Sequence, residues 1–437
     1  MSVKVCKFGG TSMADRNSIS RVTDIIKSDN ARQFIVVSAP GKRFKEDIKV
    51  TDTLYKCYDE KVKTGTCKET FKIIRERFAA IKEEMGLKID LKSLLDEIEQ
   101  GIDKSVSPDY AASRGEYLSA KIMSEVLGVE FVDAADIIKF NTKGVFDSET
   151  TNDLVKKTLA DSDGAVIPGF YGTLPDGTVK TFSRGGSDFT GAIIARGVSA
   201  TIYENWTDVD GFMTADPRIV KNPELIGIIS YDELRELSYM GASVLHPDSV
   251  FPLQGTNIPI NIKNTFNPSA PGTMIVKDAL GKSNKLVTGI AGRKGFTTIL
   301  IKKSMMNAEV GFCRKVLSVL ENYNVSLEHM PTGIDTMSII LPDTDLEDGL
   351  ETEVVEKIRG KVNPDYMRVI KDVSLLTVVG HGMSNQTGTA AKAFTALANA
   401  GVNIRMIDQG SSELNIIIGI NTADFEKAIE AIYHAFF

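Results

Sequence analysis

Residues 3–12 read Val-Lys-Val-Cys-Lys-Phe-Gly-Gly-Thr-Ser, a short alternating run that meets two consecutive glycines. The run predicts a strand that enters a tight loop, and Thr11 and Ser12 are favourable residues for capping a following helix. Residues 16–28 then carry isoleucine and valine at helical spacing, and residues 33–38 form a short apolar run rich in β-branched side chains. Strand, glycine loop, helix and strand make a βαβ unit, which predicts a mostly parallel α/β sheet.

The remainder of the first 283 residues fits the same sheet with one insertion. Residues 53–110 are heavily charged and carry apolar stripes at helical spacing, which predicts an all-helical insertion over one edge of the sheet. A polar link at 281–285 follows a stretch rich in turn residues, so we place the end of a first domain, 1–283, there. Further strands are expected at 129–133, 164–168 and 201–206.

Beyond residue 285 one pattern occurs twice. Each copy has the order strand, helix, strand, strand, helix, which predicts an internal duplication of a βαββαβ unit. The second copy ends on its helix without a final strand, so the strand-like residues before the first copy are expected to complete it. The two domains are thus expected at 297–371 and at 286–292 plus 373–437. Their middle strands are expected at 325–330 and 402–407.

Composition excludes several classes of protein. The chain has 437 residues, enough for two or three domains of about 150 residues each. Its 51 basic and 58 acidic residues give a formal charge of −7, which argues against a nucleic-acid binder because such proteins need a basic face. No apolar run approaches the roughly 18 residues of a membrane span, and the N-terminal stretch does not resemble a signal peptide. Four cysteines without a C-x-x-C pair and four histidines leave little material for structural zinc. We therefore expect a reduced cytoplasmic protein.

The loop at 7–12 is the first motif that carries chemistry. Consecutive glycines between a strand and a helix let backbone N–H groups converge on an anion, and the helix N-terminus adds partial positive charge. Lys7 beside such a loop can meet the terminal phosphates of a nucleotide. A plain strand-to-helix turn, with Lys7 as a solvated charge, explains the same residues equally well.

A second glycine loop precedes an apolar helix at 183–190, Ser-Arg-Gly-Gly-Ser-Asp-Phe-Thr. Arg184 offers a bidentate fork for a carboxylate, and Asp188 can order a lysine or magnesium around a phosphoryl group. An ordinary capped helix is the alternative. Two anion-binding loops in one sheet indicate a phosphate donor and an anionic acceptor.

The third motif, Asn-Trp-Thr-Asp-Val-Asp-Gly at 205–211, follows the last residues of a strand. Ligands bind at strand ends in open α/β sheets. Asp208 and Asp210 could face ribose, magnesium or a turn, and for an isolated Asp-x-Asp-Gly the turn is favoured.

Four motifs occur in order along the chain, at 7–12, 183–188, 206–211 with 216–218, and 241–247. In this order they resemble the aspartate kinases of the amino-acid kinase family, over essentially the whole chain. The duplicated C-terminal unit resembles the tandem ACT domains that those enzymes carry. The resemblance implies an amino-acid kinase fold, with a mostly parallel sheet between helices and a helical insertion, followed by two α+β ACT domains.

The resemblance also implies the reaction. ATP phosphorylates the side-chain carboxylate of L-aspartate to give 4-phospho-L-aspartate and ADP, with Mg²⁺ accompanying the nucleotide and no separate metal site. This is the first step of lysine, threonine and methionine biosynthesis, and it implies feedback inhibition, here by L-lysine at the ACT domains. Because exposed ACT edges usually pair, a homodimer or a dimer of dimers through these domains is expected.

Catalytic roles carry over motif by motif. Lys7 is implied to neutralise charge on the transferring phosphoryl group, and Gly9 and Gly10 to supply N–H donors. Asp188 is implied to order the lysine and magnesium. A carboxylate nucleophile needs no general base, so positioning and charge neutralisation have to supply the rate enhancement. The residues implied in nucleotide binding are Lys7, Phe8, Gly9, Gly10, Thr207, Asp208, Met213, Thr214, Asp216, Pro217 and Arg218.

Binding roles for aspartate and for the effector carry over in the same way. Arg184 is implied to hold the α-carboxylate of aspartate and Glu116 its ammonium, while Thr51 and Ser187 complete the site. Glu328 suits the ε-ammonium of lysine, although a solvated glutamate at a strand end explains it as well. The residues implied in effector binding are Met306, Gly311, Phe312, Ser326, Leu327, Glu328 and Thr332.

The chain departs from the family pattern at three places. Ser243 stands where some members have a lysine that touches phosphate, and Met213 stands where a tyrosine is common. The loop that begins at 39–42 is longer before Thr51 than in a typical member. Two alternatives are another amino-acid kinase, of the acetylglutamate or glutamate 5-kinase type, and a catalytically inactive amino-acid sensor.

Overall fold

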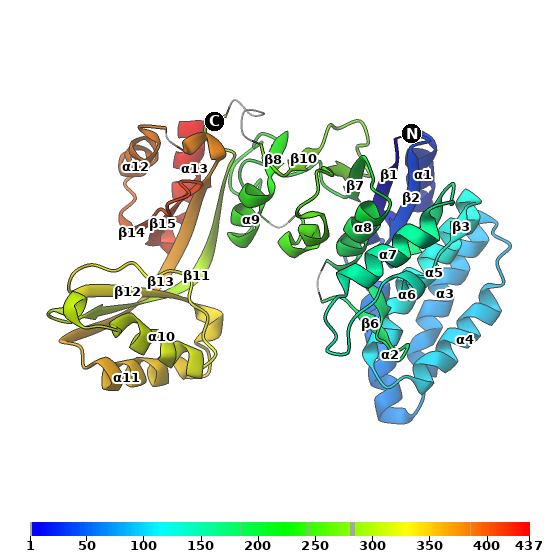
Figure 1. Ribbon diagram of the computed structural model, residues 1–437, viewed down its shortest axis with the longest axis horizontal. Coiled ribbons are helices and arrows are strands. Elements are labelled where there is room, and N and C mark those ends of the chain that lie inside the picture. Colours follow the sequence, from blue (N-terminus) through cyan, green and yellow to red (C-terminus); the bar gives the residue numbers. More distant parts are fainter. Residues whose placement is uncertain (1, 184, 243, 280–284, 385) are drawn as a thin grey trace. The chain divides into compact units, whose positions relative to one another are not determined.

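The computed structural model describes residues 2–183, 185–242, 244–279, 285–384 and 386–437 (Figure 1). The chain forms two compact units. The first consists of Met1–Phe212, Leu225–Leu234 and Ser243–Ala279, and the second of Met213–Glu224, Arg235–Ala242 and Leu280–Phe437. Most of the expected link at 281–285, with the boundary at 283, lies outside the described residues.

An eight-stranded sheet forms the centre of the first unit, with strand order β3-β4-β2-β1-β7-β9-β10-β8. Neighbouring strands pair in parallel, except β9 with β10. The expectation of a mostly parallel α/β sheet is therefore confirmed. The strands are β1 (Lys4–Phe8), β2 (Arg32–Val37), β3 (Glu130–Phe131), β4 (Ala165–Pro168), β7 (Ile202–Thr207), β8 (Ile228–Ser230), β9 (Ile260–Asn264) and β10 (Thr273–Val276).

Helix α1 (Arg16–Lys27) connects β1 to β2 and completes the βαβ unit. The expected cap of this helix is wrong. Gly10–Met13 form a 3-10 turn, and Asp15 caps α1 by accepting a hydrogen bond from the Ser18 N–H at 2.8 Å. The Ser12 hydroxyl is buried and shares a 2.8 Å hydrogen bond with the Thr265 hydroxyl, so it does not cap the helix.

The insertion is helical, as predicted. Its long helices pack their apolar faces into one core that includes Cys6 and Phe8 of β1. The helices are α2 (Val50–Thr64), α3 (Lys68–Met85), α4 (Leu91–Lys104) and α5 (Pro108–Leu127), drawn from blue to cyan in Figure 1. The other elements of this unit are α6 (Ala134–Ile137), α7 (Ser148–Leu159), α8 (Gly186–Gly197) and the hairpin β5 (Tyr171–Thr173) with β6 (Val179–Thr181).

Alternation along β1 and β7 gives the two faces of the sheet different chemistry. Cys6 is the register partner of Glu204, and Lys7 is the register partner of Asn205. Because successive side chains of a strand point to opposite faces, Lys7 and Asn205 share one face and Cys6 and Glu204 the other. We call the face that carries Cys6 and Glu204 the structural face. The opposite face, which carries Lys7 and Asn205, is available for a site.

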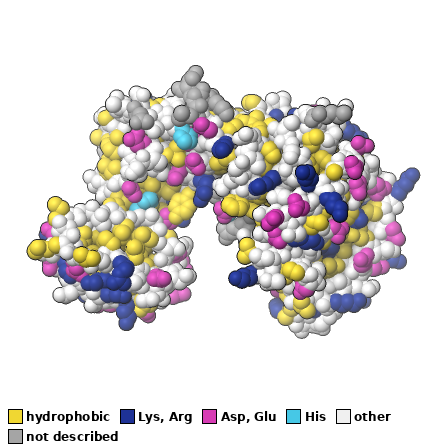
Figure 2. All heavy atoms as spheres, in the orientation of Figure 1, with side chains coloured by type: hydrophobic (Ala, Val, Ile, Leu, Met, Phe, Trp, Pro, Cys, Tyr) yellow, Lys and Arg dark blue, Asp and Glu magenta, His cyan; other side chains and the backbone are white. Residues whose placement is uncertain are grey.

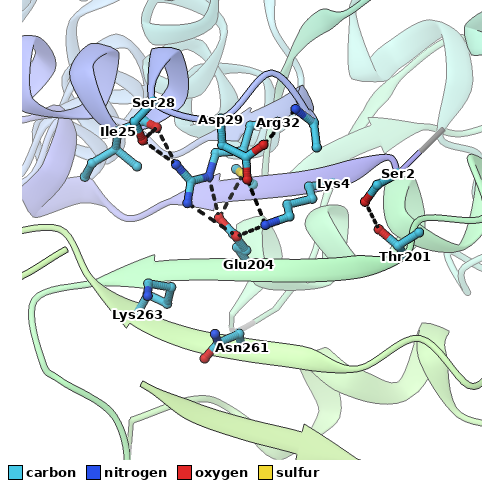
Figure 3. Close-up of polar contacts among 12 residues, drawn as sticks. Ser2, Lys4, Ile25, Ser28, Asp29, Arg32, Thr201, Glu204, Asn261 and Lys263 are labelled. Atoms are coloured by element: carbon cyan, nitrogen blue, oxygen red, sulfur yellow. Dashed lines mark hydrogen bonds and ion pairs between the residues drawn. The ribbon is translucent and has the colours of Figure 1, made fainter. Parts of the chain in front are cut away.

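A charge network surrounds Glu204 on the structural face (Figure 3). This glutamate is 3% exposed and accepts hydrogen bonds from Arg32 at 2.8 Å, Lys4 at 3.2 Å and the Trp206 indole at 3.0 Å. Burial opposes ionisation, but the hydrogen bond from Arg32 and the charges of Arg32 and Lys4 hold the pKa of Glu204 below its ordinary value. The network ties together β1, β2 and β7 and so fixes the register that places Lys7 beside Asn205.

The second unit contains a five-stranded antiparallel sheet of order β12-β11-β13-β15-β14. Its strands are β11 (Gly289–Lys302), β12 (Thr336–Pro342), β13 (Tyr366–Val379), β14 (Ile404–Asp408) and β15 (Asn415–Asn421). Its main helices are α10 (Phe312–Asn322), α11 (Leu350–Val362), α12 (Thr389–Asn399) and α13 (Phe425–Phe436). One further helix, α9 (Tyr231–Tyr239), begins in the first unit and ends in the second.

Both ACT-like copies share the long strands β11 and β13. Residues 289–294 pair with residues 374–379, next to β15, whereas residues 298–302 pair with residues 366–370 on one side and β12 on the other. The two strands expected separately before and within the first copy are therefore one continuous strand. Its first half lies in the sheet of the second copy.

The prediction of a strand at 325–330 is wrong, because these residues do not form a regular strand. Within this stretch one isolated bridge joins β12, at His329 with Ile340, and a second lies just beyond it, at Thr332 with Met337. Pro331, between the two bridges, has no N–H to donate, so a continuous ladder cannot form there.

The surface is mixed in charge. On the face shown in Figure 2, Lys and Arg side chains are interspersed with Asp and Glu side chains rather than gathered in one basic area. Within the described ranges, no helix is long and apolar enough to cross a bilayer.

Candidate active site

The glycine loop after β1 is packed too closely for any other residue at Gly10. A Cβ on Gly10 would lie 2.9 Å from the carbonyl oxygen of Ala39, and the Gly41 N–H donates to the Gly10 carbonyl at 2.7 Å. At the neighbouring position, Nζ of Lys7 lies over Gly9, where a Cβ would come within 3.5 Å of it. The loop therefore presents bare backbone beside the lysine, which is the arrangement that a phosphate needs.

Lys7 is bound to Asp188 of the second glycine loop. Nζ of Lys7 lies 2.5 Å from Oδ1 of Asp188, and the two side chains are only 9% and 17% exposed. Asp188 sits in the first turn of α8, and the residue that precedes this helix as its N-cap, Gly185, has a φ of 62°. This left-handed conformation favours glycine and lets the helix begin over the strand that carries Lys7. The sequence-predicted pair of loops is thus brought together.

Asn205 of β7 contacts the same carboxylate and was not expected in the site. Its Nδ2 donates to Oδ1 of Asp188 at 2.9 Å, and the Tyr203 hydroxyl donates to the Asp188 main-chain carbonyl at 3.1 Å. Sequence analysis treated Asn205 only as the first residue of a strand-end motif. The alternation of β7 was the available signal, because Tyr203, Asn205 and Thr207 are polar and share the face that also carries Lys7.

Glu116 lies in the middle of α5 and is 5% exposed. Its Oε2 is buried, and among the residues that the structure describes it has no hydrogen-bond partner. Burial raises the pKa of Glu116 to about 8, against the opposing effects of a hydrogen bond with the Ala39 backbone and of the charges on Arg114 and Lys7. The site therefore contains a buried carboxyl group that forms no ion pair with any described residue, although the charges of Arg114 and Lys7 act on it.

Two other residues predicted to bind aspartate, Thr51 and Ser187, lie where small residues allow neighbouring segments to approach closely. A Cβ on Gly115 would lie 2.6 Å from Cβ of Ala39 and 3.1 Å from Val50, so α5 and the start of α2, where Thr51 stands, approach closely. Ser187 is 8% exposed and packs against Gly169 after β4. Arg184 and Ser243 lie outside the described residues.

The residues at the end of β7 and just after it differ in what their side chains contact. Asp210 accepts hydrogen bonds from the side-chain amides of Asn264 at 2.8 Å and Asn267 at 3.2 Å, which supports the turn interpretation. Asp208 is exposed and accepts from the Thr11 hydroxyl at 3.4 Å, so it lies beside the first glycine loop. Thr207 donates to Asp208 at 3.3 Å.

Several residues expected to bind nucleotide have their side chains committed elsewhere. Phe8 is fully buried and stacks on Trp206 at a centroid distance of 5.9 Å, because it points to the structural face. In the second unit Thr214 is 1% exposed and its hydroxyl donates to the Glu224 carbonyl at 3.0 Å. For these two residues, a contact of the side chain with a nucleotide is not supported.

In the loop that follows Thr214, charged side chains contact each other and the loop's own main chain. Asp216 accepts from the Arg218 guanidinium and from the Arg218 N–H, and the guanidinium hydrogen bond lowers the pKa of Asp216. Pro217 lies between them, and Met213 is half-buried. This segment belongs to the second unit.

The predicted effector site lies in the second unit, and its carboxylate is already engaged. The Glu328 side chain is 4% exposed, with Oε2 accepting from the Tyr239 hydroxyl at 2.7 Å and Oε1 lying 3.5 Å from the Arg293 guanidinium. Burial and the hydrogen bond to Glu328 raise the pKa of Tyr239 to about 12. The interpretation of Glu328 as a solvated glutamate is therefore wrong.

The other expected effector residues fall into two groups. Met306 and Phe312 are 5% and 3% exposed and belong to the apolar core between α10 and the sheet, so only their backbone is available to a ligand. Gly311 has a φ of 80° at the start of α10, where glycine is favoured. The exposed members are Ser326, whose N–H donates to Asp345, together with Leu327 and Thr332.

Comparison with known proteins agrees with this architecture. Residues 2–264 match the amino acid kinase family, and residues 376–436 match the ACT domain. The chain is 40% identical to aspartokinase 3 of Bacillus subtilis, over all of this chain and 99% of that protein. The chain therefore belongs to the amino acid kinase family, and within it to the aspartokinases.

Solved structures of this family superpose over the whole chain. The aspartate kinase of Clostridium acetobutylicum does so with a TM-score of 0.96 at 50% identity, covering all of both chains. Escherichia coli aspartokinase III has been solved with aspartate and ADP and with lysine and aspartate. These two structures give TM-scores of 0.75 and 0.76 at 25% identity, over at least 99% of both chains.

Proposed function

We propose that the protein is an aspartate kinase, which transfers the γ-phosphoryl group of ATP to the side-chain carboxylate of L-aspartate. The observation that carries this proposal is the buried Glu116 carboxyl group, which has one oxygen without a hydrogen-bond partner among the described residues and is acted on by the charge of Lys7, the partner of Asp188. An amino acid brings an ammonium group that satisfies such a carboxylate. Its side-chain carboxylate can then face the lysine.

The reaction needs little covalent help from the protein. A carboxylate oxygen of aspartate forms a bond to the γ-phosphorus while the bond from that phosphorus to the bridging oxygen breaks, and ADP leaves with the electron pair. Lys7 neutralises charge on the transferred group, and the bare backbone at Gly9 and Gly10 offers N–H donors to the phosphates. Burial strengthens these interactions, because Lys7 and Asp188 are largely shielded from water.

Magnesium is proposed to enter with the nucleotide rather than to occupy a site of its own. Over the parts of the chain that are described, no three or more His, Cys, Asp or Glu side chains gather as a metal cluster. Asp188 fits a role beside the ion, because no protein hydrogen bond to its Oδ2 is found within the same residues. Magnesium, when bound, supplies further neutralisation of phosphate charge.

The remaining site assignments are proposals of the same kind. Thr51 and Ser187 complete the aspartate site, and Arg184 holds the α-carboxylate. Thr207 and Asp208 contact the nucleotide from the end of β7. Met213, Asp216, Pro217 and Arg218 contribute from the loop that follows, through main-chain groups and exposed side-chain atoms.

Trapping of the product with hydroxylamine tests the proposal. We expect ATP-dependent hydroxamate formation with L-aspartate and at least 100-fold less with L-glutamate or N-acetyl-L-glutamate, because the site fixes both ends of a short dicarboxylate. Greater activity with a glutamate substrate indicates another amino acid kinase. Absence of ADP release with saturating aspartate, ATP and magnesium indicates an inactive sensor.

We further propose L-lysine as the effector and a homo-oligomer as the working form. Glu328 supplies a buried carboxylate for an ε-ammonium, provided that the cation displaces Arg293 from it. Exposed apolar side chains around the start of α10, at Met305, Val310 and Ile334, support pairing of this unit with a second copy. Sedimentation of the intact chain with and without lysine tests the oligomer.

A further inference from the structure

We infer that Asn205 is a positioning residue for the phosphoryl-transfer site, which holds the Asp188 carboxylate in the one orientation that serves Lys7. This inference rests on the proposed kinase function, but it concerns a residue to which neither the family motifs nor the sequence assign a role.

Two donors from neighbouring strands converge on one oxygen of Asp188. Nζ of Lys7 lies 2.5 Å from Oδ1, and Nδ2 of Asn205 lies 2.9 Å from the same atom. Lys7 and Asn205 are register partners on β1 and β7, so the sheet sets the spacing of the two donors. With two donors on Oδ1, the carboxylate cannot rotate freely about its terminal bond, and Oδ2 takes neither of these donors.

An amide is suited to this place because it donates without charge. Asn205 is 2% exposed, so a cation there would carry a large desolvation cost and would compete with Lys7 for Asp188. A carboxylate there would repel Asp188. An aliphatic residue would fill the space but leave Oδ1 with Lys7 alone, free to swing with that flexible side chain.

Tyr203 supplies a matched control on the same strand face. Its hydroxyl donates to the main-chain carbonyl of Asp188, not to the carboxylate. Tyr203→Phe therefore removes one hydrogen bond from the same residue and the same helix turn while leaving the carboxylate held. Any difference between variants at 203 and 205 reports on the carboxylate itself.

The first test compares Asn205→Leu, which is close in size, with Tyr203→Phe. For Asn205→Leu we expect kcat to fall about 10- to 100-fold, as for other residues that orient a group at a reacting centre, with the aspartate KM within about twofold of the wild type. For Tyr203→Phe we expect kcat within about threefold of the wild type. A wild-type kcat in Asn205→Leu, or an equal loss in both variants, overturns the inference.

The second test is the pH profile of Asn205→Asp at saturating aspartate, and it applies even if Asn205→Leu does not fold. A protonated carboxyl donates an O–H to Oδ1 of Asp188 as the amide does, whereas an ionised one repels it. The groups facing this position are Lys7, Asp188 and Tyr203, and Lys7 also acts on Glu116. We expect kcat of the variant, relative to the wild type, to fall at least tenfold between pH 6 and pH 8.5.

A constant ratio of the two kcat values across that pH range overturns the inference, because a purely structural role does not depend on the proton. Failure of the proposed function is distinguishable from this result. In that case the wild type itself forms no aspartyl hydroxamate, whereas here the wild type is active and only the variants disagree with expectation.

Discussion

Glu116 in the first unit and Glu328 in the second are both expected to receive an ammonium group, yet the protein surrounds them differently. Both side chains are about 5% exposed or less. One oxygen of Glu116 has no hydrogen-bond partner in the described part of the chain, and burial raises the pKa of Glu116 to about 8. Both oxygens of Glu328 are engaged, by Tyr239 and by Arg293.

Glu116 can therefore bind an ammonium group without losing an existing partner. Glu328 has to exchange a partner before it can bind one. An unpaired buried carboxyl group is costly, and a substrate ammonium removes that cost directly. A carboxylate that already holds an arginine and a tyrosine gains little from a second cation unless one partner leaves. Substrate binding is therefore expected to be coupled to a proton, and effector binding to be coupled to the contacts of Tyr239 and Arg293.

Lys7→Met gives the largest expected effect, because it removes the cation at the centre of the first site. We expect kcat to fall about 1000-fold or more, measured as ADP release at saturating aspartate. The charge of Lys7 lowers the pKa of Glu116. The substitution should therefore also raise that pKa and move aspartate binding, followed by calorimetry, to higher pH. A kcat within tenfold of the wild type would remove Lys7 from the reaction centre.

Glu116→Gln tests whether the orphan carboxyl group binds the substrate ammonium. We expect the aspartate KM to rise about 10- to 100-fold and kcat to change by only a few-fold, because a charge-assisted hydrogen bond is lost in the ground state and transition state alike. Glu83→Gln, at an exposed position of α3, is the control and should behave as the wild type. An unchanged KM would exclude Glu116 from the substrate site.

Glu328→Ala tests whether the buried carboxylate of the second unit binds the effector. We expect the lysine concentration for half-inhibition to rise at least tenfold, with kcat in the absence of lysine unchanged, because the carboxylate that pairs with the ε-ammonium is gone. Inhibition curves at fixed aspartate measure this. If the wild type is insensitive to millimolar lysine, lysine is not the effector.

Tyr239→Phe gives the smallest expected effect, in the opposite direction. Loss of the hydroxyl frees Oε2 of Glu328, so lysine meets less competition and should inhibit at about three- to fivefold lower concentration. Movement of both variants in the same direction would contradict the exchange of partners at Glu328.

The sequence predicted the fold where local pattern and packing agree. The βαβ unit that starts at residue 3, the helical insertion and the ACT duplication all follow from apolar periodicity, which the packing of each element reinforces. The prediction was wrong where a tertiary contact overrode local preference. Ser12 bonds to Thr265 instead of capping α1, and the stretch 325–330 meets β12 only through an isolated bridge at His329.

Sequence motifs predicted which residues belong to the site, but they did not predict which atoms contact one another. The motifs predicted that Lys7 and Asp188 act together. No local sequence pattern predicts that Asn205 donates to the same oxygen of Asp188. That contact depends on the register of β1 with β7. The partners of Glu328 were hidden for the same reason, because Tyr239 and Arg293 are distant in sequence.

The pH dependence of the aspartate KM tests whether the buried Glu116 carboxyl group receives the substrate ammonium. With the pKa of Glu116 near 8 in the free protein, the carboxyl group is neutral below that pH and must lose its proton to bind an ammonium. We predict a KM that falls about 15-fold between pH 6.5 and pH 8 and levels off near pH 9, with this dependence absent in Glu116→Gln. A wild-type KM that is constant from pH 6.5 to 9 would contradict the account.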